Sequence, residues 1–178
     1  IGNAKTLYML LLVSLVLLTM AIIFLASVLK GVIWAKTTKT KLTIALISKF
    51  LLLNLIWMVF WFVLIVLVSV FVEPQSAPIF MTVVILLSLY FTNTLYTIFM
   101  RTQKLKSIIT AVKVNILNIH LFLLPYALII LLFFIIMQGT NLLEFRYSAI
   151  LGSLILIVYA AIVRYYVSNL VIKIEGNK

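Results

Sequence analysis

Long apolar runs separated by short basic segments are the main pattern along this chain. Each run is long enough to cross a hydrocarbon core of about 30 Å as a helix rising about 1.5 Å per residue. The pattern predicts an all-α, polytopic helical membrane protein whose residues 1–178 form a single transmembrane domain. A further span upstream of residue 1, giving six in all, would also fit. The predicted transmembrane helices cover about 7–29, 50–72, 79–100, 114–137 and 147–171.

Two basic segments come directly before apolar runs. We expect 39–49 and 101–113 to form amphipathic helices in the membrane interface, with their lysines among the headgroups. Trp34 fits the aromatic belt that marks such an interface. Pro74 and Pro78 bracket a tight turn that should end one span and start the next.

The distribution of basic residues predicts an orientation. Of the 14 lysines and arginines, only Lys5 and Arg146 fall on one side of the predicted spans, and the other twelve fall on the opposite side. Because cytoplasmic loops are enriched in Lys and Arg, we expect an outside N-terminus and an inside C-terminus. Plasma membrane is the expected location.

Composition supports lipid as the main surrounding. The chain is 66% hydrophobic and 10% charged, whereas soluble domains are near 45–50% apolar and about 25% charged. The net charge of +11 lies at the ends of apolar runs, which favours anionic headgroups over nucleic acid as the partner. Other membrane subunits are a second expected class of partner.

A short pattern occurs twice, 64 residues apart. It reads [ST]-I-x4-K-x4-N-[LI], and it indicates either an internal duplication or convergent use of one interfacial design. In each copy the lysine would reach the headgroups, and the asparagine would offer its amide to a neighbouring helix. The matched pairs are Thr43 with Ser107, Ile44 with Ile108, Lys49 with Lys113, and Asn54 with Asn118.

Polar residues within the apolar runs are the candidate sites. An ionisable group inside a membrane suggests a proton or substrate pathway, but the more common case is a neutral histidine bonded within the bundle, and His120 fits either description. Arg164 could face an aqueous groove or a partner subunit, or extend to the interface. Pro125 could be a hinge or a packing feature. The candidate intramembrane polar site comprises Asn54, Asn115, Asn118, His120 and Arg164.

Aromatic and basic residues form the candidate contact surfaces. Trp57, Phe60 and Trp61 share one helix face and predict a contact with another helix or subunit, or the wall of a hydrophobic groove. The candidate contacts for lipid or partner on the basic side are Lys39, Lys41, Lys49, Lys104, Lys106 and Lys113.

Signatures of catalysis are missing from the sequence. The chain has no cysteine, no glycine-rich phosphate loop, no HExxH motif and only three carboxylates, Glu73, Glu144 and Glu175. We therefore expect no enzymatic activity and no metal or other cofactor.

Three segments together resemble a known family. They are the basic approach to Lys49-Phe50, the stretch from Phe99 to Asn115, and the ending from Tyr165 to Asn169 with its lysine-bearing tail. Their order and spacing are similar to the YesL-like small membrane proteins of Gram-positive bacteria, a family of unknown function. The resemblance implies five or six spans and an association with carbohydrate ABC importers. It implies no catalytic residues.

These observations favour a non-enzymatic accessory subunit of a bacterial plasma-membrane complex, linked to solute uptake. The alternatives are a small transporter or channel in its own right, and a membrane-protein insertase of the YidC/Oxa1 type. The insertase has a matching topology, but its long cytoplasmic hairpin has no counterpart in residues 30–41, and its groove arginine is missing.

Overall fold

The computed structural model describes residues 2–141 and 148–176, and these residues are helical apart from short connections. Among the described residues, five helices are long and apolar enough to span a membrane, which confirms an all-α polytopic membrane protein. A sixth helix in the described residues, α4, is too short to span a membrane. The helices are α1 (Gly2–Thr37), α2 (Ile44–Phe71), α3 (Ala77–Thr102), α4 (Ser107–Leu117), α5 (Ile119–Asn141) and α6 (Ser148–Gly176).

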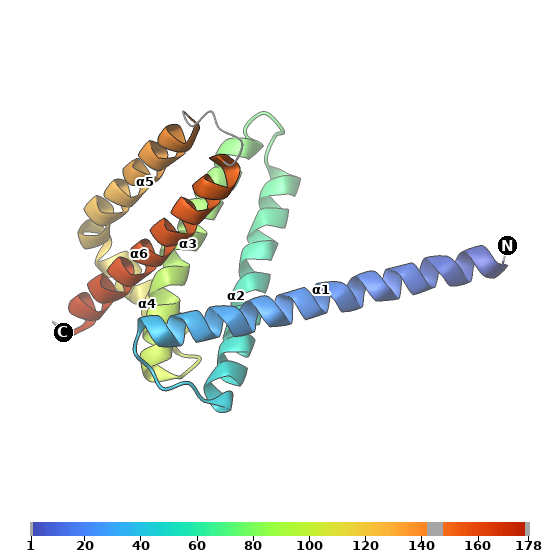
Figure 1. Cartoon of the computed structure of the whole chain (residues 1–178), viewed down its shortest axis with the longest axis horizontal. Coiled ribbons are helices and arrows are strands. Elements are labelled where there is room, and N and C mark those ends of the chain that lie inside the picture. The colour runs from blue at the N-terminus through green and yellow to red at the C-terminus, as the bar shows by residue number, and fades with distance from the viewer. Residues whose placement is uncertain (1, 142–147, 177–178) are drawn as a thin grey trace.

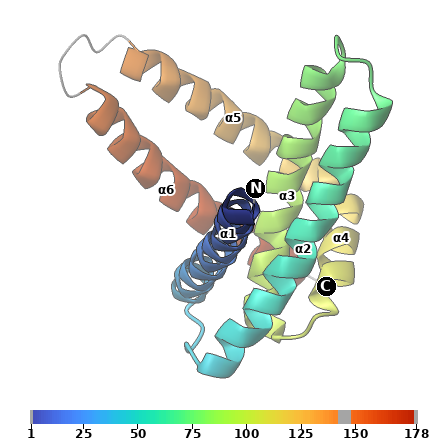
Figure 2. The ribbon, with the colours of Figure 1, turned by 90° about the vertical axis from the view of Figure 1, so that its right-hand side faces the viewer.

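The helices form three arms that meet at one end, called the base. Antiparallel hairpins α2–α3 and α5–α6 make two arms and diverge from the base (Figure 2), while α1 alone leaves it sideways (Figure 1). The C-terminal parts of α1, α3 and α6 contact one another there. Their buried side chains build most of the hydrophobic core, which includes Trp34, Ala35, Leu95, Tyr96, Ile98, Phe99, Met100, Val167, Val171 and Ile174.

Helix α1 is longer than the predicted span and packs only through its last third. From Lys5 to Ala26 no side chain is buried, and Ser27 is the first buried residue. Trp34 was predicted to lie in an interfacial belt, and this prediction is wrong. Its ring is buried and meets Tyr96 edge to face, with the ring centroids 5.7 Å apart.

Turns at the base interrupt both predicted interfacial helices. Residues 40–43 are not helical, and α2 begins at Ile44 with the Thr43 hydroxyl accepting a bond from the amide of Leu46. Thr43 is therefore a helix cap. The segment 101–113 also divides, because α3 continues to Thr102 and α4 starts only at Ser107. The prediction of a separate helix over 39–49 is therefore wrong, because 44–49 belong to α2. A separate short helix does occur near 101–113, but it starts later and ends at Leu117.

The predicted span 114–137 is interrupted at Asn118, between α4 and α5. Pro125, the expected kink, lies inside α5 instead. The asparagine side chain bonds to the carbonyl of Val114, four residues back, and this competes with a regular helix. The interruption therefore lies seven positions before the proline.

The ends of the hairpins away from the base agree in part with expectation. Residues between α2 and α3 turn as predicted, and Pro78 lies in the first turn of α3. Residues 138–141, predicted as loop, still belong to α5. Glu144, Arg146 and the rest of that loop lie outside the described residues.

Close contact between α1 and α2 depends on Gly31. A Cβ at Gly31 would lie 3.1 Å from Cδ1 of Phe50, which is fully buried, whereas a Cβ at Gly139 in α5 would meet nothing within 4 Å. We predict that Gly31→Leu lowers the free energy of unfolding by about 1–3 kcal/mol through overpacking. Thermal unfolding in mild detergent measures this, with Gly139→Leu as the control. An equal loss in both variants would contradict the prediction.

Candidate functional site

The amide of Asn54 ties three helices together at the base. Its Nδ2 donates to Oγ of Ser27 in α1 at 2.6 Å, and its Oδ1 accepts from the hydroxyl of Tyr96 in α3. All three residues are buried. The sequence indicated that Asn54 would bond to a neighbouring helix, but it did not identify Ser27 and Tyr96, which lie within apolar runs and carry no distinguishing pattern.

The predicted aromatic contact face is divided between the inside and the outside of the molecule. Trp57 is buried, and its Nε1 donates to Oγ1 of Thr92 in α3 at 2.8 Å. Phe60 stacks on Trp57 and is exposed, while Trp61 is half-buried. Trp57 therefore holds the α2–α3 hairpin together and is not free for a partner; Phe60 is the member of the face that remains accessible.

The predicted polar cluster near the start of the fourth span is dispersed. Asn115 is buried, and its Oδ1 accepts from Thr94 of α3 at 2.7 Å, while its Nδ2 has no hydrogen-bond partner among the described residues. Asn118 bonds within its own helix, contrary to the expected bond between helices. His120 is exposed on α5. These three residues do not form a joint site.

Arg164 of α6 faces the C-terminal end of α1, at the base. Its guanidinium carbon lies 5.6 Å from the centroid of the Trp34 ring, which is a cation–π geometry. The residue is half-buried. Arg164 therefore helps to hold α1 against α6, a contact within the bundle that was not among the interpretations drawn from the sequence.

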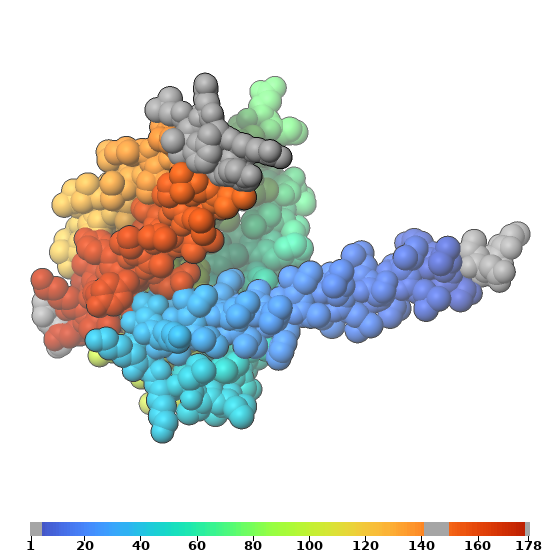
Figure 3. All heavy atoms as spheres, viewed as in Figure 1, coloured from blue at the N-terminus to red at the C-terminus, as the bar shows by residue number. Residues whose placement is uncertain are grey.

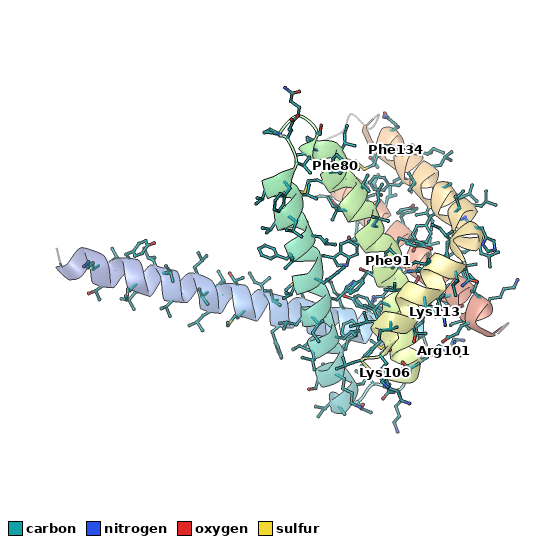
Figure 4. All side chains as sticks on the ribbon, turned by 180° about the vertical axis from the view of Figure 1, so that it is seen from behind. Phe80, Phe91, Arg101, Lys106, Lys113 and Phe134 are labelled. Carbon is teal, nitrogen blue, oxygen red and sulfur yellow. The ribbon has the colours of Figure 1, made fainter. Side chains whose placement is uncertain are left out.

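The base also collects the basic side chains. Arg101, Lys106 and Lys113 lie toward this end, and Phe80 and Phe134 lie toward the other (Figure 4). Arg101 forms an ion pair with Glu175 near the end of α6. The predicted contact lysines are all exposed, namely Lys39, Lys41, Lys49, Lys104, Lys106 and Lys113.

A hollow of about 420 Å³ opens at the base beside α4 and the end of α6. Its walls are mainly apolar, with one cationic and one anionic side chain. Such a combination suits an amphipathic group that has a charged head and an apolar body. The lining residues are Ile109, Thr110, Lys113, Val114 and Glu175.

Among the described residues, no three His, Cys, Asp or Glu side chains gather in a way that could hold a metal ion. Comparison of the chain with family models, with curated proteins and with solved structures gives no match.

The buried amide network yields a paired prediction. Asn54→Leu leaves Ser27 and Tyr96 without their buried partner, so we expect the free energy of unfolding to fall by about 1–3 kcal/mol. Asn118→Leu removes only a bond to its own helix and should cost less than about 1 kcal/mol. Thermal unfolding of both variants in detergent tests this. A larger loss for Asn118→Leu would contradict the role of Asn54.

Proposed function

We propose that this chain is a non-enzymatic accessory subunit of a bacterial plasma-membrane complex. The observation that carries the proposal is the arrangement of α1: its last third packs into a compact base, whereas no side chain from Lys5 to Ala26 is buried (Figure 3). A helix that is apolar on all sides is normally surrounded by lipid or by other helices. The arrangement suits a subunit that assembles with others.

The base supplies a second surface for assembly. Under the predicted orientation its exposed lysines lie at the cytoplasmic side, where anionic headgroups and acidic protein surfaces are both available. The resemblance to YesL-like proteins favours a carbohydrate importer of the ABC type as the complex.

Isolation from the native membrane tests the proposal. We expect the tagged chain, extracted in a mild detergent, to co-purify with another integral membrane protein. Native mass spectrometry should show a fixed ratio between the two chains. The control is the same extraction after exchange into a harsh detergent, which should release the chain. A chain that migrates alone under gentle conditions, and that conducts solutes in liposomes, would instead make it a transporter in its own right.

The exposed lysines at the base give an independent prediction. Charge reversal of Lys39, Lys41, Lys104 and Lys106 to Glu should lower recovery of the complex at least tenfold if these side chains bind a cytoplasmic surface of the partner. Co-purification measures this, and Lys5→Glu is the control because Lys5 lies at the far end of α1. Unchanged recovery together with weaker binding to anionic vesicles would assign the lysines to lipid alone.

A further inference from the structure

Arg164 is a cation inside a candidate membrane span, and no anion of the described chain lies beside it. It precedes Lys173 of α6 by nine residues, which places it about 14 Å further along the helix from the base. Within the described residues its guanidinium contacts the Trp34 ring and forms no hydrogen bond or ion pair. A charged group within a span is costly unless it is paired. Arg164 therefore has donors that the described chain does not use.

The described carboxylates are engaged or lie elsewhere. Glu175 forms its ion pair with Arg101 at the base. Glu73 lies in the turn between α2 and α3, at the end of that hairpin away from the base. Neither of them faces Arg164, so the counter-ion of the guanidinium comes from outside the described part of the chain.

Ser168 adds a second unused polar group on the same side of α6. It follows Arg164 by four residues, so the two side chains share one face of the helix. Ser168 is 1% exposed, and its Oγ has no hydrogen-bond partner among the described residues. Such a hydroxyl is uncommon, because burial removes its bonds to water. The guanidinium and the hydroxyl can donate to one anion.

Helix α1 brings a second cation to the same place. Lys30 precedes Trp34 by four residues and therefore shares the side of α1 that Arg164 approaches. Lys30 is exposed and forms no ion pair within the described residues. Two cations and a hydroxyl between α1 and α6 match a phosphate group, since a guanidinium binds phosphate through paired bonds and an ammonium binds it as a point charge.

The apolar side chains around this place indicate the source of the phosphate. Leu29 and Ile33 of α1 and Ile162 of α6 are exposed, and within a membrane such side chains face acyl chains. A water-soluble anion would have to cross this apolar surface, whereas a lipid carries its phosphate on its own acyl chains. A choline head would bring a third cation to the site, so an anionic head is favoured.

We propose that Arg164, Ser168 and Lys30 bind the phosphate of an anionic membrane lipid between α1 and α6. The acyl chains of this lipid lie against the exposed apolar side chains of the two helices. The bound phosphate supplies the counter-ion that Arg164 lacks and joins α1 to α6 through a shared anion. This inference goes beyond the proposed function and does not depend on it.

Native mass spectrometry of the full chain in a mild detergent tests the inference. Phosphatidylglycerol is added to the delipidated protein, and the apparent Kd of the first bound lipid is measured. We expect Arg164→Gln to weaken this binding about tenfold, because it removes charge-assisted hydrogen bonds to the phosphate. The matched control is Lys113→Gln, which removes a basic side chain at the hollow of the base. The control should change the Kd less than about twofold, as expected for an exposed charge.

Ser168→Ala separates binding from packing. Because the Ser168 hydroxyl has no partner among the described residues, we expect the lipid-free variant to unfold at the same temperature as the unchanged chain or higher. Phosphatidylglycerol should stabilise the unchanged chain by linkage and should stabilise Ser168→Ala less. Lower stability without lipid together with an equal gain from lipid would overturn the inference, since Ser168 would then be a packing residue. This variant also carries the test if Arg164→Gln does not fold.

Three further outcomes would overturn the inference. Equal weakening by Arg164→Gln and Lys113→Gln, or equal affinity for phosphatidylcholine and phosphatidylglycerol, would assign lipid binding to the basic surface as a whole. Displacement of the lipid by glycerol phosphate would show a site for a soluble anion. Each of these results leaves the proposed accessory role standing, because co-isolation of a partner subunit is measured separately.

Discussion

Convergence of three helix ends at the base is the constraint on which the rest of the structure depends. The last turns of α1, α3 and α6 supply the large buried side chains, and α2 and α4 close around them with Phe50 and Val114. Burial of such side chains is the main source of stability within the chain, since the outer arms meet few neighbours. The tight turns after Thr37 and Thr102 follow from this geometry, because each must return the chain to the same core.

Polar groups make this convergence specific. Apolar packing alone distinguishes poorly between registers of a helix surrounded by lipid, whereas a buried amide has defined partners. Asn54 sets the position of α1 relative to α3, Asn115 sets α4 against α3 through Thr94, and Trp57 fixes the hairpin through Thr92. Each of these bonds joins residues far apart in the sequence, and Trp57 lies midway along α2.

The sequence predicted the fold class and the approximate spans, because hydropathy over about 20 residues is a strong signal. It failed where local chemistry decides. The lysine-rich segment 39–49 looked amphipathic, but a left-handed residue at Lys39 and the cap at Thr43 exclude a separate helix there. Asn118 looked like a bridge between helices and is a helix breaker. The sideways course of α1 follows from contacts at Ser27, Gly31 and Trp34. The hydrophobic pattern within α1 does not predict this direction.

Helix α1 is packed against the rest of the chain at one end only, so a small rotation there gives a larger displacement at its other end. The stretch from Lys5 to Ala26 extends for roughly 33 Å beyond the packed end, so a tilt of about 10° at Ser27 displaces its far end by roughly 6 Å. The contact between Gly31 and Phe50 lies at this fixed end, where a Cβ on Gly31 would come within 3.1 Å of the ring. A small change of tilt at the base would therefore move the far end of α1 by a much larger distance.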